Sequence, residues 1–154
     1  MITILLKEND IPALTSFAGN IDSDSLKPFI FIAQTNDITP ILGLSLYNKI
    51  YADFENDALT GVYKDIYDNY LIYMLAYFSC SHYIAMNSSK VSNNGVIKPE
   101  QTTDLKEIDR LSARYNSLGN NVLVNFKEYM KTVNVPEYNN GCVEKRKTNV
   151  INWY

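Results

Sequence analysis

The sequence predicts a mainly α, single-domain fold, a helical bundle of about four helices with one short β-hairpin between the two longest helices and an extended C-terminal tail. Three observations lead to this prediction. Apolar residues recur at helical spacing through most of the chain, the stretch KVSNNGVIKP contains the Asn-Gly pair typical of a tight hairpin turn, and the last twenty or so residues lack such periodicity. We assign the helical domain to residues 1–133, the hairpin to residues 90–98 and the tail to residues 134–154.

Length and composition are those of one globular domain. A chain of 154 residues can bury a core without a metal or disulfide, and its 46% hydrophobic and 20% charged residues are in the soluble range. The longest apolar run, residues 71–78, is too short for a membrane span of about 20 residues, so we expect no membrane partner. The N-terminus lacks the pattern of a signal peptide, which predicts a protein that stays in the cytoplasm where it is made.

The first third of the chain predicts an arm and two helices. Residues 2–6 (ITILL) are apolar and β-branched, which suggests a short strand or an extended arm. A helix is expected from about Leu26 to Gln34, because capping residues precede it and Pro28 lies in its first turn. Pro40 starts a second helical stretch, interrupted at Gly43, with apolar residues three and four positions apart.

Two long helices are expected in the rest of the domain. From Val62 to Met86 apolar residues are too frequent for a single face, which predicts the central helix of the bundle. Residues 104–131 form a long amphipathic helix, in which the sequence Gly-Asn-Asn at 119–121 predicts a kink or a break. Eight of the twelve tyrosines lie between positions 47 and 83, a concentration common at the edges of cores and in subunit interfaces.

Few residues support catalysis. Cys80 and His82 are two positions apart and point about 200° apart on a helix, so they cannot share a metal ion. We interpret His82 as a helix residue with a satisfied ring nitrogen and Cys80 as a small buried hydrophobic residue. The sequence has no glycine-rich phosphate loop and no hydrolase or zinc-protease motif, so we assign no catalytic, cofactor-binding or metal-binding residue and predict no enzyme.

Charge is distributed unevenly along the chain. Residues 1–60 carry three lysines and eight acidic residues, whereas residues 90–154 carry ten basic and seven acidic residues. Two interpretations remain open: chance scatter on a solvated surface, or a subunit whose two sides attract each other in a head-to-tail assembly.

The hairpin and the tail are predicted interaction surfaces. An isolated two-stranded ribbon is marginal in water, so we expect the hairpin to contact another subunit, where the neighbour's residues 2–6 or its hairpin would be available for strand addition. The basic run of the tail could contact phosphate or an acidic protein surface, and the apolar end could dock into a groove on another subunit. The predicted interface residues are Val91, Asn94, Gly95, Val96 and Ile97 in the hairpin, and Lys145, Arg146, Lys147, Val150, Ile151, Trp153 and Tyr154 in the tail.

A further pattern lies between residues 20 and 132. A helix ending in Ala33-Gln34 leads to a proline and a Leu-Gly-x-x-Leu-Tyr core, followed by a Tyr-rich apolar helix, a VSNNGVI loop and a charged helix. This order resembles the head-tail connector (adaptor or ring) proteins of tailed bacteriophages, above all the portal-vertex ring proteins of crAss-like phages. The residues of the core motif are Pro40, Leu42, Gly43, Leu46 and Tyr47.

The resemblance implies a structural virion protein, made in a bacterial host, that forms a homo-oligomeric ring, usually a dodecamer, below the portal. Such a ring extends the DNA channel and docks tail components, so the implied partners are other copies of the chain, the portal protein and neighbouring connector or tail proteins. Genomic DNA would pass without sequence-specific binding, and no cofactor or catalytic residue is implied. Two alternatives remain from the residues: a small helical regulatory or DNA-binding module that uses the basic run at 145–147, and an enzyme of unknown type.

Overall fold

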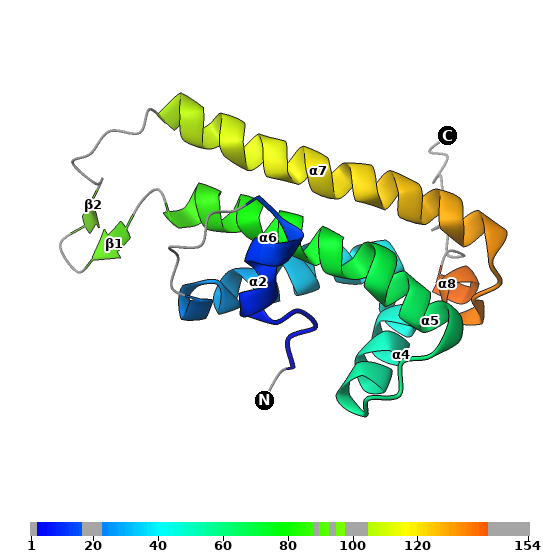
Figure 1. Cartoon of the computed structure of the whole chain (residues 1–154). Helices are drawn as coiled ribbons and strands as arrows, with labels where there is room; N and C mark the ends of the chain where they lie inside the picture. The colour runs from blue at the N-terminus through cyan, green and yellow to red at the C-terminus, as the bar shows by residue number, and fades with distance from the viewer. Residues whose placement is uncertain (1–2, 17–22, 88–89, 93–94, 98–104, 142–154) are drawn as a thin grey trace, which may run out of the picture.

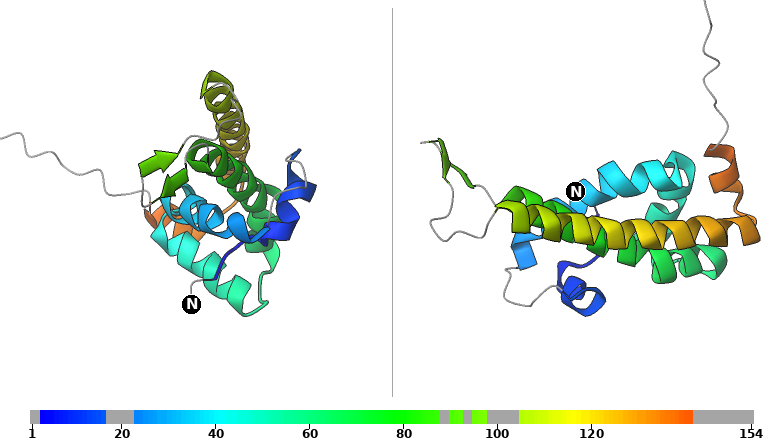
Figure 2. Two further views of the ribbon diagram at one scale, coloured as in Figure 1. Left: turned by 90° about the vertical axis from the view of Figure 1, so that its left-hand side faces the viewer. Right: turned by 90° about the horizontal axis from the view of Figure 1, so that it is seen from above.

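The helices of the protein are stacked in layers around α6 (Ile72–Asn87). A computed structural model describes residues 3–16, 23–87, 90–92, 95–97 and 105–141. The longest helix, α7 (Leu105–Thr132), lies along one side of α6, and α2 (Lys27–Ala33) packs on another side (Figures 1 and 2). The molecule is therefore a layered helical body with α6 between its outer helices.

The other helical elements are shorter, and two of them are π-helical turns that connect neighbouring helices without a break. Backbone angles stay in the right-handed helical region across both turns, so residues 27–42 form one helix and residues 61–87 another. The shorter elements are η1 (Glu8–Asp10), α1 (Ile11–Leu14), η2 (Ser23–Ser25), η3 (Gln34–Ile38), α3 (Thr39–Leu42), α4 (Leu44–Glu55), α5 (Gly61–Ile66), η4 (Tyr67–Leu71) and α8 (Pro136–Gly141).

The fold class is α, as predicted, but the architecture differs from the prediction in the number of helices. Counted as continuous runs, the described residues form six helices rather than about four. The interruption predicted at Gly43 is confirmed, because Gly43 takes φ 75° and ψ 152°, a conformation that only glycine adopts easily. The separate helix start predicted at Pro40 is wrong, because the helix that begins at Lys27 continues to Leu42. Pro40 lies in the first turn of α3, two residues after the π-helical turn η3, and η3 shifts the hydrogen-bonding register before the proline.

The prediction of a β-hairpin as an element of the packed fold is wrong: the helical layers contain no strand among their described residues. The strand pairing that the structure describes is one short antiparallel ladder between β1 (Lys90–Ser92) and β2 (Gly95–Ile97). Both strands lie beyond the ends of α6 and α7 (Figures 1 and 2). A ladder this short has no sheet to join and adds little stability of its own.

The prediction of a central helix is confirmed by α6. Met74, Leu75 and Ala76 follow one another along the chain and are all fully buried, so this part of the helix has no solvent-facing side. Phe78 and Cys80 are buried as well, at 3% and 0% exposure. The expected apolar circumference is therefore covered by the surrounding elements.

The predicted kink or break at Gly119 is wrong, because α7 continues from Leu105 to Thr132 as one helix. Gly119 is required for close packing: a Cβ atom at this position would lie 2.5 Å from Cε1 of the Phe78 ring. The glycine therefore lets α7 approach α6, and the cost of its low helix propensity is offset by that contact.

The first part of the predicted tail belongs to the helical body. Val135 is 1% exposed, and α8 packs against α4. The ring of Tyr138 packs edge-on against Phe126, with centroids 5.8 Å apart, and the Tyr63 hydroxyl donates to Oε2 of Glu137 over 2.8 Å. Pro136 starts a helix here rather than ending one, so residues 136–141 are helical and not extended, while residues 142–154 lie outside the described residues.

The N-terminal arm, residues 3–6, is held by side chains of its own subunit. Gln34, which is fully buried, accepts the Leu5 N–H with Oε1 at 2.9 Å and donates from Nε2 to the Thr3 carbonyl at 3.2 Å. The hydroxyl of Tyr51 accepts the Thr3 N–H at 2.8 Å, and that of Tyr67 donates to the Leu5 carbonyl at 2.7 Å. The backbone N–H and C=O groups of Thr3 and Leu5 therefore have partners within the subunit, and Leu5 and Leu6 are buried, while strand addition to this segment by a neighbouring subunit stays a prediction.

Replacing Gly119 with alanine should destabilise the protein by roughly 1–3 kcal/mol, because the added methyl group collides with the buried Phe78 ring. The matched control is Asn121→Ala on the exposed side of the same helix, which should raise stability by a few tenths of a kcal/mol through helix propensity. The free energy of unfolding in urea measures both. Equal stability of the two variants would contradict the role assigned to Gly119.

Replacing Gln34 with leucine should lower the free energy of unfolding by roughly 2–5 kcal/mol, because it leaves the buried Leu5 N–H and Thr3 carbonyl without a partner. Asn36→Leu, on an exposed position of the same helix, should change stability by only about 0.5 kcal/mol. Hydrogen exchange of the Leu5 amide should become faster in Gln34→Leu alone. Unchanged exchange at Leu5 would show that Gln34 does not hold the arm.

Candidate functional site

The core-motif residues lie where α3 meets α4, and they pack and turn the chain. Leu42 and Leu46 are buried at 1% and 0% exposure, and Gly43 supplies the positive φ between the two helices. The Tyr47 hydroxyl accepts from Nε2 of Gln34 at 2.7 Å, and the exposed Pro40 lies in the first turn of α3. The motif therefore maintains the fold and brings no reactive group to the surface.

The two residues considered for metal or acid-base chemistry have structural environments. Nε2 of His82 lies 2.7 Å from Oδ2 of Asp37, which joins α6 to η3 and confirms the predicted satisfied ring nitrogen. Cys80 is fully buried as a free thiol, and burial raises its pKa to about 12, so it is not a nucleophile at neutral pH. Among the residues that the structure describes, no group of His, Cys, Asp or Glu side chains is placed to hold a metal ion.

Among the helices that the structure describes, none has the length and hydropathy needed to cross a membrane.

The tyrosines of the central region are used mainly inside the subunit. Tyr47, Tyr51 and Tyr67 belong to the hydrogen-bond network around the arm, and Tyr63 reaches Glu137 on α8. Their rings also fill the edge of the core, as in the pair of Phe54 and Tyr67, whose centroids are 5.4 Å apart. The tyrosines were expected at the edge of the core or in a subunit interface, and the structure shows these ones at the edge of the core.

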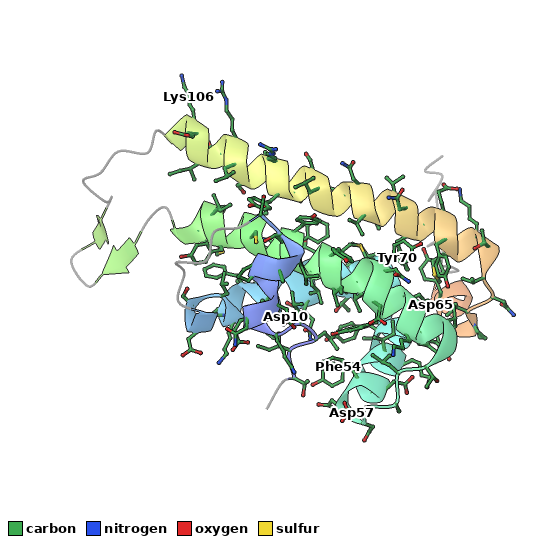
Figure 3. All side chains as sticks on the ribbon, in the orientation of Figure 1. Asp10, Phe54, Asp57, Asp65, Tyr70 and Lys106 are labelled. Carbon is green, nitrogen blue, oxygen red and sulfur yellow. The ribbon has the colours of Figure 1, made fainter. Side chains whose placement is uncertain are left out.

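Exposed carboxylates surround the pair of Phe54 and Tyr67. We call this group the acidic surface, and none of its members forms an ion pair within the described residues. Figure 3 shows three of them around Phe54. The members are Asp10, Glu55, Asp57, Asp65 and Asp68.

The carboxylates of the acidic surface help to raise the pKa of two neighbouring tyrosines. The pKa of Tyr67 is raised to about 12, first by burial and then by the carboxylates of Asp68 and Asp10. The pKa of Tyr129 is also raised, by burial first and by Asp65 next. Like charges that disfavour an ionised phenol create a negative potential here, which would attract a cationic partner.

The outer face of α7 is the other charged surface. Lys106, Arg110 and Arg114 follow one another at spacings of four and form one exposed row over two turns. Glu107 and Asp109 are exposed on the same turns, so this end of the helix carries both signs with an excess of positive charge. We define the outer face of α7 by its exposed row of Lys106, Arg110, Arg114, Ser117, Asn121, Val124, Glu128 and Lys131.

The cationic row of α7, from Lys106 to Arg114, lies away from the acidic surface, whose Asp65 is close to Tyr129 near the other end of α7. In Figure 1, α7 forms the upper layer and α4 the lower one, with α6 between them, and the end-on view of Figure 2 shows the same order. Figure 3 places Lys106 at the far end of α7 from Asp57 and Asp65. The uneven charge of the sequence thus becomes a separation of charge in space.

The structure describes only some of the predicted interface residues of the hairpin and tail. The backbones of Val91, Gly95, Val96 and Ile97 belong to β1 and β2, with Val91 opposite Val96. Asn94 and the tail residues Lys145 to Tyr154 lie outside the described residues. Their contacts with another subunit stay predictions, and the acidic surface and the outer face of α7 are surfaces that sequence reasoning did not locate.

The sequence profile of one family, described as a family of unknown function (DUF6712), matches residues 38–148. The matched region starts at the end of η3 and includes the core motif and all later helices, but not the arm. No curated protein and no solved structure matches the chain.

Proposed function

The chain belongs to the DUF6712 family, and we propose that this member is a structural protein of a bacteriophage virion, a head-tail connector subunit. In this proposal it assembles with further copies into a ring below the portal, extends the DNA channel and docks tail components. Its partners are itself, the portal protein and the neighbouring connector or tail proteins.

One observation carries the proposal: the cationic row of α7 lies away from the acidic surface on one subunit (Figure 3). A subunit with complementary surfaces that lie apart associates head to tail, and a head-to-tail interface closes into a ring when the rotation between copies allows it. Charge complementarity also sets the orientation in which neighbours meet. A ring subunit needs these properties and no catalytic group.

The resemblance to phage connector proteins supports the same function. The core-motif residues among those that carry it pack and turn the chain: Leu42 and Leu46 are buried, Gly43 has a positive φ, and the Tyr47 hydroxyl accepts from Gln34. These residues stabilise the fold of the subunit and do not determine how many copies form the ring.

The tail and the strands are assigned to contacts with neighbouring proteins. Trp153 and Tyr154 are the anchors, because large aromatic side chains dominate the energy of small interfaces, and the basic run at 145–147 would pair with an acidic protein surface. The strand residues at 90–97 would contact a neighbouring subunit beyond the ends of α6 and α7.

The purified chain should form oligomers in native mass spectrometry, alone or when mixed with the portal protein encoded beside it, because its complementary surfaces associate head to tail. Association should weaken as salt rises from about 50 to 500 mM, since exposed charges are screened over a few ångströms at high salt. A chain that stays monomeric under both conditions would contradict the proposal. Tight binding to duplex DNA that is lost on neutralising Lys145, Arg146 and Lys147 would instead favour a DNA-binding module.

Deleting residues 143–154 should reduce incorporation into virus particles without unfolding the protein, because the described helical body ends at Gly141. The thermal unfolding midpoint should stay within about 2 °C of the full-length value. A variant with Trp153 and Tyr154 replaced by alanine should show the same loss. Normal incorporation of both variants, measured by gel analysis of purified particles, would remove the tail from the proposed interface.

A further inference from the structure

The middle of the outer face of α7 differs in composition from both of its ends. No charged residue lies between Arg114 and Lys127, although six positions there face solvent. One of them is Val124, which is 57% exposed. These six positions are Asn116, Ser117, Asn120, Asn121, Val124 and Asn125.

This composition does not follow from the needs of a solvated helix. The polar side of an amphipathic helix is normally charged, and asparagine and serine are weak helix formers. The interior helix α6 needs only the opposite side of α7, so the side chains at these six exposed positions are not required to cover α6. Depletion of charge with short side chains and an exposed valine is instead the composition of the centre of a protein interface, where charged residues are avoided.

We propose that the outer face of α7 is the surface on which the acidic surface of a second copy of this chain docks. The inference rests on the proposed ring and deepens it by naming the two surfaces that meet. The uncharged middle would be the desolvated centre, and the cationic row at Lys106, Arg110 and Arg114 would lie opposite carboxylates of the second copy.

Charge complementarity selects the second copy as the occupant. The acidic surface offers five exposed carboxylates without an ion pair in the described residues, and Arg110 and Arg114 are likewise exposed without one. In Figure 3, Lys106 lies at the end of α7 that is far from Asp57 and Asp65, so the cationic row that starts at Lys106 cannot reach these carboxylates within one subunit. Pairing them with Arg110 and Arg114 therefore requires a second copy.

The face is long enough for such an interface. From Lys106 to Lys131 it extends about 38 Å at about 1.5 Å per residue, and with a helix width of about 10 Å it offers roughly 400 Å². That is about half of the roughly 800 Å² that each partner contributes to a standard interface. The flanks of α7 and the neighbouring edge of α6 would supply the rest.

Two variants that each remove one of the surfaces test the proposal. Arg110→Glu with Arg114→Glu reverses the cationic row, and Asp57→Asn with Asp68→Lys weakens the acidic surface, where asparagine keeps the positive φ of 51° at position 57. Each variant alone should associate at least tenfold more weakly than the wild type in native mass spectrometry. An equal mixture should form one-to-one heterodimers and nothing larger, because only one functional pair of surfaces remains between the two variants.

The uncharged middle is tested by a matched pair of substitutions. Asn121→Glu places a charge at the centre of the face and should weaken association at least tenfold, whereas Asn36→Glu, at an exposed helical position outside both surfaces, should leave it unchanged. Far-UV circular dichroism and the unfolding midpoint establish that all variants are folded.

The outcomes separate this inference from the proposed function. A wild-type chain that forms oligomers, together with variants that form them equally well, overturns the inference and leaves the ring in place. A wild-type chain that stays monomeric alone and with the portal overturns both. Duplex DNA binding that Arg110→Glu with Arg114→Glu abolishes, without any change in oligomer formation, assigns the cationic row to nucleic acid and overturns the inference as well.

Discussion

A helix without a polar side has to be covered all round, and α6 imposes that constraint on the rest of the fold. Met74, Leu75 and Ala76 point in successive directions and are all buried, so α6 cannot lie at the surface. α7 covers it on one side, α2 on another and α1 near Cys80. Burying this apolar area provides the main driving force for the layered arrangement. The close approach of α7 at Gly119 follows from the same need, since a side chain there would separate the two helices at Phe78.

The arm is held to the helical body by polar groups as well as apolar ones. Gln34 presents an amide that pairs with the arm as the backbone of a neighbouring strand would, with one accepted and one donated bond. Its own carbonyl accepts the Thr39 hydroxyl at 2.8 Å, across the π-helical turn that precedes Pro40. The π-helical turn η3, which precedes Pro40, therefore also contains Gln34, the residue that holds the arm. Buried polar groups cost free energy unless all are paired, and no unpaired buried side-chain atom is found among the described residues.

The interior and the proposed assembly surface meet at Tyr67. Its hydroxyl donates to the Leu5 carbonyl inside, while Asp68 and Asp10 on the acidic surface help to raise its pKa to about 12. The other surface, on α7, is attached to the same core through Gly119 and Phe126. Both surfaces are thus attached to one packed core, and a ring subunit needs a constant placement of its surfaces if each interface is to repeat with the same angle. The family profile spans this body from Ile38 onward and names no function for it.

The sequence by itself determined the α class, the central place of the apolar helix and the amphipathic nature of α7, because hydrophobic periodicity is a local property. The same reasoning read Pro40, Gly43 and Tyr47 correctly as residues of packing and turns. It could not find the roles of Gln34 or Gly119, since a glutamine at a helix end reads as a solvated residue and a mid-helix glycine as a breaker. It placed residues 134–141 in an extended tail and added a β-hairpin at residues 90–98 to the helical bundle. Only the tertiary structure decided these, because Leu5 lies 29 positions from Gln34 and no local pattern contains the path that brings them together. The separation of the acidic surface from the cationic row of α7 has the same origin, since charges scattered along a chain become surfaces only when the helices that carry them are stacked.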